Sequence, residues 1–398
     1  MAGAKSTRTE RPSAKGERVR LASVVAPFRA DATEDTKPSG RAGKTGRART
    51  TQHQVIPSGA KKARLPEKLF PQLATLVSAA PTTGDWIYEV KFDGYRILTR
   101  IKHGKPALFT RRGHDWSSKM PALVEQLRTL GIKSAWLDGE IVVMGKDGVP
   151  SFNALQNAFD RARTADIQYF LFDVPFFEGY DLRQVPLRDR RRLLKTLLET
   201  RATDKIRFSD DLAGDGTSIF AAACRMKLEG VIAKRADAPY VSRRSKTWLK
   251  LKCTQRQEFV IVGFTDRKGE RTAPGIGSLL LGVHDDAGKL VFAGSVGTGW
   301  STETAADLKR RLVALEVKHP PFADATKPKS GRWSRRSAVP ERWVKPVLVA
   351  EISFSEWTPD GQLRHASFEG LRMDKPAQSI TRERALEPEL AGRKPLRR

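Results

Sequence analysis

The segment WIYEVKFDGYR, residues 86–96, holds the most informative pattern in this 398-residue sequence. After Trp86 and Ile87, apolar and polar residues alternate from Tyr88 to Asp93, as in a β-strand whose successive side chains point to opposite faces. Glu89 and Lys91 then share one face of the strand. Asp93-Gly94 predicts a turn after it, and glycine allows the backbone to approach a ligand closely. A lone Lys-x-Asp-Gly pattern also fits an ordinary strand with a surface lysine, so this segment alone leaves both interpretations open.

A second alternating segment, WLKLK at residues 248–252, places two lysines on one face of a predicted strand. Lys250 and Lys252 project together, whereas Leu249 and Leu251 point inward. Because two neighbouring ammonium groups repel each other, we expect an anion to lie between them.

Two isolated carboxylates stand at the edges of further predicted strands, Glu140 in LDGE (residues 137–140) and Glu229 in LEGVIAKR (residues 228–235). Each alone is more often a solvated turn residue, but together they offer oxygen ligands for a divalent cation. Phe172, in a strand-like run, fits a core position, and it also fits a flat surface for a base.

The pattern between residues 86 and 252 indicates a mixed α/β domain. We expect strands at 86–91, 135–144, 169–174, 230–234 and 247–252, and helices at 120–130, 153–162, 187–200 and 218–227. After residue 252 we expect strands at 259–265, 279–284, 290–295 and 347–357, and one helix near 302–317. This pattern predicts that the second domain is a small, mostly β barrel. We expect a polar hinge at residues 253–257 to join it to the first domain. The proline-rich, basic residues 320–342 predict a loop.

The net charge of +27 indicates a polyanionic partner. Residues 1–65 carry 15 basic and 5 acidic side chains and a single aromatic, Phe28, so we expect a disordered basic tail. Such a tail fits a solvated spacer. It also fits a non-specific DNA-binding arm, because each lysine or arginine that neutralises a phosphate releases counterions. The other 333 residues still carry +17, so phosphate binding is not confined to the tail.

Several classes of protein are excluded by composition. No apolar run approaches the roughly 20 residues of a membrane-spanning helix, and the polar N-terminus lacks the apolar region of a secretory signal. We therefore expect a cytoplasmic protein without membrane partners. Cys224 and Cys253 are too few for a four-cysteine zinc site and argue against a disulfide framework. Oxygen atoms would then hold any metal, which favours Mg²⁺ or Mn²⁺.

Taken in order, these motifs resemble the nucleotidyltransferase superfamily of ATP-dependent DNA ligases, RNA ligases and messenger-RNA capping enzymes. Within it, the sequence is most similar to the ligase module of bacterial non-homologous end-joining (LigD-type) ligases. The resemblance runs from about Leu65 to Lys375. Four further motifs carry it: TRRGHDW at 110–116, GSLLLGV at 277–283, VGTG at 296–299 and FEGLRMDK at 368–375.

The resemblance implies an α+β fold, in which an adenylation (nucleotidyltransferase) domain of mixed sheets and helices precedes an OB-fold β-barrel domain. The expected boundaries are 1–65 for the tail, 66–252 for the adenylation domain, 253–385 for the OB-fold domain and 386–398 for a basic C-terminal tail. The implied enzyme is an ATP-dependent DNA ligase, which passes AMP from a lysine to the 5′-phosphate of a break and then seals it. End-joining ligases often carry polymerase and phosphoesterase modules, which we do not expect here because only the tail is left over.

The family's residue roles carry over to matching positions. Lys91 would attack the α-phosphate of ATP, and repulsion from nearby Lys250 and Lys252 would favour its neutral amine. The remaining implied roles are adenine contact for Glu89, purine stacking for Phe172, sugar and 5′-phosphate contacts for Arg96 and Arg111, ribose and metal contacts for Glu140, metal binding for Glu229, phosphate neutralisation for Lys250 and Lys252, and pyrophosphate orientation for Arg372, Asp374 and Lys375. The last three lie in the second domain, so the domains must close over ATP and reopen for DNA.

Two other functions remain as alternatives. An RNA ligase or capping guanylyltransferase shares the lysine motif, although the glycine-rich motifs of the second half argue against it. A catalytically idle DNA-binding scaffold would not need all four of Lys91, Glu229, Lys250 and Lys252. The sequence departs from related ligases at Arg112, Arg243 and Ala366, where asparagine, glycine and proline are frequent; these positions concern nick affinity and loop geometry.

The expected partner is nicked or broken duplex DNA, and the expected small molecules are ATP with Mg²⁺ or Mn²⁺. A Ku-like end-binding protein is a candidate partner in end joining. We expect a monomer that associates with the nucleoid.

Overall fold

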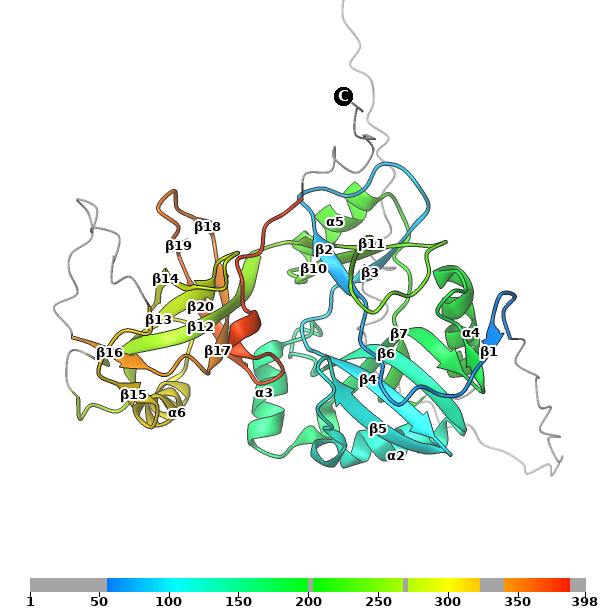
Figure 1. Ribbon diagram of the computed structural model, residues 1–398, viewed down its shortest axis with the longest axis horizontal. Helices are drawn as coiled ribbons and strands as arrows, with labels where there is room; N and C mark the ends of the chain where they lie inside the picture. Colours follow the sequence, from blue (N-terminus) through cyan, green and yellow to red (C-terminus); the bar gives the residue numbers. More distant parts are fainter. Residues whose placement is uncertain (1–55, 200–202, 268–270, 323–339, 387–398) are drawn as a thin grey trace, which may run out of the picture.

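The computed structural model describes residues 56–199, 203–267, 271–322 and 340–386. They form two domains, which are joined between strands β11 and β12 (Figure 1). The first domain contains a seven-stranded and a four-stranded sheet. The second contains a seven-stranded sheet, with a helix, α6, beside it, and a two-stranded sheet (Figure 1). The architecture is a nucleotidyltransferase domain followed by an OB-fold domain, as expected.

The strands of the first domain are β1 (Lys61–Lys62), β2 (Leu73–Leu76), β3 (Trp86–Val90), β4 (Tyr95–Lys102), β5 (Lys105–Thr110), β6 (Ser134–Val142), β7 (Gln168–Phe177), β8 (Tyr180–Asp181), β9 (Ile206–Phe208), β10 (Gly230–Arg235) and β11 (Arg244–Lys252). Its helices are α2 (Pro121–Thr129), α3 (Phe152–Asp160), α4 (Leu187–Glu199) and α5 (Gly216–Arg225), with short 3-10 turns η2 (Ser117–Lys119) and η3 (Thr164–Asp166). The larger sheet has the order β1-β8-β7-β6-β4-β5, with β9 beside β7, and the smaller sheet has the order β2-β11-β10-β3.

The second domain consists of β12 (Gln255–Asp266), β13 (Ile276–His284), β14 (Leu290–Val296), α6 (Thr302–Val313), β15 (Glu316–Val317), β16 (Glu341–Val344), β17 (Val349–Phe354), β18 (Glu356–Trp357), β19 (Leu363–Arg364), β20 (Ser367–Arg372) and the 3-10 turn η5 (Ala377–Ser379). The long strand β12 pairs with β13 on one side and with β16 and then β17 on the other. Strand β20 pairs with the edge of β17 that faces away from β12. In the described ranges no pairing joins β20 to β14.

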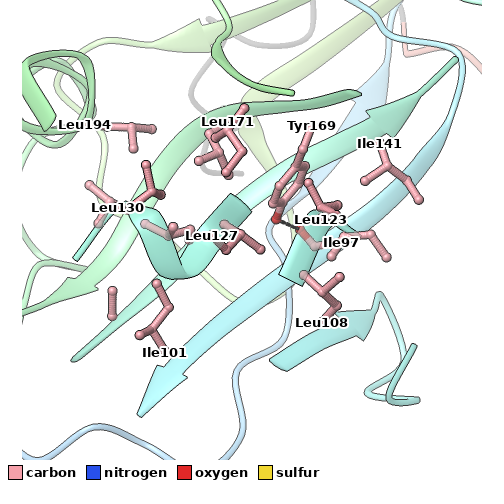
Figure 2. Close-up of a cluster of buried hydrophobic side chains, with 14 of the residues drawn as sticks. Ile97, Ile101, Leu108, Leu123, Leu127, Leu130, Ile141, Tyr169, Leu171 and Leu194 are labelled. Carbon is pink, nitrogen blue, oxygen red and sulfur yellow. Dashed lines mark hydrogen bonds between the residues drawn. The ribbon is translucent and has the colours of Figure 1, made fainter. Parts of the chain in front are cut away.

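The main core of the first domain lies where α2 and α4 pack on the larger sheet. Leu123 and Leu127 of α2 and Leu194 of α4 meet the sheet residues Ile97 and Ile101 there (Figure 2). Tyr169 enters the same cluster, and its hydroxyl donates a hydrogen bond of 2.8 Å to the carbonyl oxygen of Ile97. Burial of these large apolar side chains stabilises the sheet that carries one wall of the site.

The two sheets of the first domain meet directly after Lys91. Strand β3 ends at Val90 in the smaller sheet, and β4 starts at Tyr95 in the larger one, so Asp93-Gly94 makes the crossing between them. A Cβ atom at Gly94 would collide with the carbonyl oxygen of Ile141, which explains why glycine stands there. The turn predicted from the sequence is confirmed, and it leaves Lys91 at the junction of the sheets.

Most of the predicted elements exist, with shifted ends. The helix expected from residue 218 begins at Gly216, because Asp215 caps it by accepting hydrogen bonds from two backbone amides. The helix expected at 302–317 ends at Val313, since the chain then pairs with β16 as β15. The expected strand at 347–357 is divided at Ser355 into β17 and β18. Strands β4 and β5 were not predicted.

The ends of the domains also differ from the expectation. Residues 56–65, assigned to the basic tail, belong to the folded part: Lys61–Lys62 pair with β8, and Ile56 packs against the main core. Residues 1–55 lie outside the described residues. The hinge is shorter than the predicted 253–257, because only Cys253 and Thr254 separate β11 from β12. Of the predicted loop at 320–342, residues 323–339 lie outside the described part, and β16 begins at Glu341.

The expectation about the cysteines is wrong. Cys224, in the last turn of α5, and Cys253, directly after β11, form a disulfide with a Cα–Cα distance of 5.1 Å. The composition argued against this bond, but the fold brings the two ends together: the Cys253 amide donates to the Glu229 carbonyl oxygen, five residues after Cys224. Across the described ranges, none of the helices has the length and apolar character needed to cross a membrane.

Candidate active site

A pocket between the two domains contains every residue that the sequence predicted for the site. Its cavity volume is about 200 Å³. Its lining includes the twelve predicted residues Glu89, Lys91, Arg96, Arg111, Glu140, Phe172, Glu229, Lys250, Lys252, Arg372, Asp374 and Lys375. Arg112, Arg243 and Ala366, the departures from the family pattern, are not among its lining residues.

Lys91 lies on the floor of the pocket as an ion pair. Its backbone amide donates a hydrogen bond of 3.0 Å to the Gly230 carbonyl oxygen, which places its side chain beside Glu229. The Lys91 ammonium contacts the Glu229 carboxylate, and the two side chains are only 18% and 7% exposed. Burial acts to raise the pKa of Glu229, but the charges of Lys91, Arg256 and Lys252 outweigh it and lower the pKa. The lysine is therefore both accessible from the pocket and held in one place.

Glu89 is buried beneath the pocket. Its carboxylate accepts a hydrogen bond of 2.7 Å from Ser209 Oγ and forms ion pairs with Lys234 Nζ at 2.6 Å and Arg191 Nη1 at 2.9 Å. Burial lowers the pKa of Lys234 to about 8, although Glu89 opposes this shift. The sequence predicted that Glu89 and Lys91 share a strand, but β3 ends at Val90, so Lys91 lies directly after the strand that carries Glu89. The Glu89 carboxylate is held by protein groups that the sequence did not assign.

Arg96 and Phe172 form one wall of the pocket. Arg96 Nη2 lies 2.6 Å from Oδ2 of buried Asp138, which also accepts a 2.7 Å hydrogen bond from the Tyr240 hydroxyl. The Arg96 guanidinium lies 4.5 Å from the centre of the Phe172 ring, and Lys234 Nζ lies 4.0 Å from it. The aromatic face is therefore part of the pocket and flanked by cations.

Glu140 and Arg111 line the pocket, and the pKa of each side chain is shifted from its ordinary value. Glu140 stands opposite Arg96 in the pairing of β6 with β4, and burial raises its pKa to about 8, against the effect of Arg96 and Lys91. Burial also lowers the pKa of Arg111, although Asp374 opposes the shift and neighbouring Arg244 adds to it. Perturbed groups of this kind are typical of functional pockets.

Lys250 and Lys252 hold an anion between them, as predicted. That anion is the carboxylate of Glu383, with one oxygen 2.5 Å from Lys250 Nζ and the other 2.8 Å from Lys252 Nζ. The two lysines hold the pKa of Glu383 well below its ordinary value. The sequence had no pattern that pointed to Glu383.

The second domain closes the pocket from the other side. Arg372 pairs with Asp374 through two contacts of 2.8 Å, and its guanidinium lies 4.8 Å from the ring centres of Tyr95 and Phe152 in the first domain. The Tyr95 hydroxyl and the Gln156 amide donate to the Leu371 carbonyl oxygen. The structure therefore shows the closed arrangement that the predicted roles require.

A buried ion-pair chain crosses the domain boundary. Arg256 Nη1 lies 2.7 Å from Asp93 Oδ2 in the turn after Lys91, and Arg256 Nε lies 3.2 Å from Glu351 Oε1. Burial raises the pKa of Asp93 to about 6, although Arg256 opposes that shift. Sequence reasoning missed Arg256 and Glu351, because nothing in their local pattern distinguishes them from ordinary strand residues.

The pocket offers carboxylate oxygens but no complete metal cage. Within the part of the chain that the structure describes, no group of three His, Cys, Asp or Glu side chains is arranged to hold a metal ion. Glu140 and Glu229 both line the pocket near Lys91. This fits Mg²⁺, which is usually held by one or two carboxylates and by phosphate oxygens of the substrate.

The fold and the pocket define the class of the molecule, a two-domain nucleotidyltransferase with a lysine between its domains. Two family descriptions match it: "ATP dependent DNA ligase domain" at residues 70–252 and "ATP dependent DNA ligase C terminal region" at residues 272–375. A solved structure titled "mycobacterial DNA ligase D complexed with ATP and MES" is 38% identical, with a TM-score of 0.60 over 79% of this chain and 98% of that one. The chain belongs to the ATP-dependent DNA ligase family.

Two similar relatives are much longer proteins. The multifunctional non-homologous end joining protein LigD of Pseudomonas aeruginosa is 46% identical over 329 residues, which are 82% of this chain and 38% of that protein. The multifunctional non-homologous end joining DNA repair protein LigD of Mycobacterium tuberculosis is 40% identical over 319 residues, 80% of this chain and 40% of the relative. The chain thus spans about two fifths of the length of these relatives.

Proposed function

We propose that the chain joins 5′-phosphate and 3′-hydroxyl ends of DNA through a lysyl-AMP intermediate and adenylated DNA, with ATP as the nucleotide. The observation that carries this proposal is the position of Lys91, in a pocket between the domains, beside Glu229 and among the cations Lys250 and Lys252. Membership of the ligase family supports the reaction type.

The first step takes place at Lys91 Nζ. Its attack forms a nitrogen–phosphorus bond to the α-phosphorus of ATP and breaks the bond to the bridging oxygen of pyrophosphate. An ammonium group has no lone pair, so the Lys91–Glu229 ion pair must separate and Nζ must lose a proton before the attack. The proton leaves to solvent through the pocket, to which the Lys91 side chain is 18% exposed, and the Glu229 carboxylate stays ionised.

The pocket walls supply the nucleotide contacts. We assign purine stacking to Phe172 and adenine recognition to the strand that carries Glu89, which Lys234 and Arg191 fix in place. Glu140 is assigned to the ribose, and Arg96 and Arg111 to the sugar and the 5′-phosphate. Lys250 and Lys252 neutralise phosphate charge, and they lie in a dry site where such charges act strongly.

A divalent cation fits the donor set near Lys91. Glu229 and Glu140 would hold Mg²⁺ or Mn²⁺, and the ion would neutralise charge on the phosphate oxygens during transfer. Release of Glu229 from Lys91 would free its carboxylate for this ligation.

The second domain orients the leaving group and then moves away. We assign pyrophosphate orientation to Arg372, Asp374 and Lys375, which reach the pocket only in the closed arrangement. A DNA duplex needs access to the adenylylated lysine, so the Arg256–Asp93 pair and the Leu371 contacts must break before the later steps.

The excess of basic residues supports a nucleic-acid partner, and residues 66–398 carry +17 of it, so this support is not confined to residues 1–65. The similarity to end-joining proteins supports a role in DNA repair by end joining, with a Ku-like end-binding protein as partner. We further propose that the chain works as a monomer in the cytoplasm, at the nucleoid.

The test is to incubate the protein with α-labelled ATP or GTP and Mg²⁺, and then with nicked DNA or nicked RNA. We expect retention of label from ATP, release of AMP on sealing of DNA, and no retention in Lys91→Ala. Lys105→Ala, which removes an exposed lysine of the same domain, is the matched control and should behave like the unmodified chain. Retention of label in Lys91→Ala, or sealing of RNA alone, would contradict the proposal.

A further inference from the structure

The segment after η5, residues 380–386, crosses from the second domain back to the first (Figure 1, red). The Ile380 carbonyl oxygen accepts from the His284 amide at 2.7 Å in the second domain. At the other end, the Leu386 amide donates at 3.0 Å to the Leu76 carbonyl oxygen of β2 in the first domain. We call residues 380–386 the strap.

The middle of the strap is fixed by Gln257, a buried residue of β12. Gln257 Oε1 accepts from the Glu383 amide at 3.0 Å, and Gln257 Nε2 donates to the Thr381 carbonyl oxygen at 3.4 Å. These backbone contacts hold the strap over the pocket and aim the Glu383 side chain into it.

Glu383 occupies the place assigned to ATP phosphates. Its two carboxylate oxygens pair separately with Lys250 and Lys252, as two oxygens of a phosphate would. The lysine side chains are 14% and 10% exposed, so their charges are mostly withdrawn from water and in need of an anionic partner. One site cannot hold both the carboxylate and a phosphate group between the same two ammonium groups.

We propose that the strap is an internal competitor of the nucleotide: Glu383 fills the polyphosphate subsite, and ATP binds only after the strap has left it. This inference rests on the proposed function, because it takes Lys250 and Lys252 as the phosphate-binding pair. The strap ties the two domains together, so its release also frees the second domain to move. Once ATP has taken the place of Glu383, the second domain must close again, so that Arg372, Asp374 and Lys375 reach the nucleotide.

The size of the effect follows from the fraction of molecules in which the strap is seated. The apparent dissociation constant of a ligand equals its intrinsic value divided by the fraction of competent protein, so a strap seated in nine molecules of ten weakens ATP binding about tenfold. Removing the Glu383 charge should recover this factor.

The experiment measures lysyl-AMP formation against ATP concentration in the full chain. Glu383→Gln should lower the ATP concentration for half-maximal labelling, by about tenfold for a strap that is seated in nine molecules of ten. The matched control is Glu356→Gln, which removes the same charge from an exposed pair with Arg364 in the second domain and should change nothing. Gln257→Leu leaves both lysines and Glu383 intact but loosens the strap, and it should shift the ATP dependence in the same direction.

The outcomes separate the two proposals. If the unmodified chain and Glu383→Gln are labelled with the same ATP dependence, the proposal that the strap competes with ATP is wrong. The proposed ligase function is not affected by that result. A higher ATP requirement in Glu383→Gln also overturns it, because Glu383 would then support nucleotide binding. Absence of label in every protein, at unchanged thermal midpoints, would instead contradict the proposed function. If Glu383→Gln does not fold, the Gln257→Leu result decides.

Discussion

Replacing Asp173 by alanine should strongly destabilise the adenylation domain. Asp173 and Arg190 have fully buried side chains and form two contacts, of 2.7 and 2.8 Å. The variant leaves the Arg190 guanidinium buried with no carboxylate beside it. Removal of one partner from such a pair costs about 3–5 kcal/mol, much of it the desolvation of the charge that is left.

Glu67→Ala is the control for Asp173→Ala, because it removes a carboxylate from an exposed ion pair and so separates the effect of burial from the loss of the pair itself. Glu67 pairs with Arg100 and Lys102 at 2.6 and 2.5 Å, distances as short as those in the buried pair, but its side chain is 64% exposed. Because water screens exposed pairs, this variant should lose at most about 1 kcal/mol.

Urea unfolding of the full chain, followed by tryptophan fluorescence and circular dichroism, measures both losses. The double variant Asp173→Leu/Arg190→Met should recover much of the loss, because apolar side chains of similar volume need no counter-charge. Equal destabilisation by Asp173→Ala and Glu67→Ala would refute the reasoning, since burial would then not decide the cost.

Three further outcomes follow from the structure. Reduction of the Cys224–Cys253 disulfide, which closes a loop with a sequence separation of 29, should lower the free energy of unfolding by about 3–4 kcal/mol; an unchanged urea midpoint with reductant, or in Cys224→Ser, would contradict this. Burial raises the pKa of Glu140 from 4.5 to about 8, so the folded protein keeps a proton that the unfolded chain releases. Stability should therefore fall as pH rises between these values, by up to about 1.4 kcal/mol per pH unit, and Glu140→Gln should flatten that slope; identical slopes in the two proteins would count against it. Deletion of residues 1–55, which stops short of the folded segment, should preserve self-adenylylation but weaken DNA binding and reduce its salt dependence. An unchanged salt slope would favour a solvated spacer.

Local alternation was enough to predict much of the site. The period of two in WIYEVKFDGYR and WLKLK identified the strand that ends directly before Lys91 and the strand that carries Lys250 and Lys252, and the repulsion between two lysines predicted an anion between them. Local patterns also singled out Glu89, Glu140, Phe172 and Glu229, and the family resemblance added Arg96, Arg111, Arg372, Asp374 and Lys375. The fold brings all twelve together although they are spread from Glu89 to Lys375.

What escaped prediction depends on contacts between distant parts of the chain. Arg256 becomes important only because the second domain closes on Asp93, and Glu383 only because the strap returns to β11. The disulfide depends on the end of α5 meeting the end of β11, which no spacing of two cysteines reveals. Strands β4 and β5 were missed because β4 begins directly after the Asp93-Gly94 turn and no break in composition marks it.

The most direct test of the account is to find where AMP is attached. The protein is incubated with ATP and Mg²⁺, digested under mildly alkaline conditions that preserve a phosphoramidate, and mapped by mass spectrometry. The account predicts AMP on the peptide that contains Lys91, at the side-chain nitrogen, and its loss when nicked DNA is added. AMP on another lysine, or an unmodified Lys91 in a protein that still seals DNA, would contradict it.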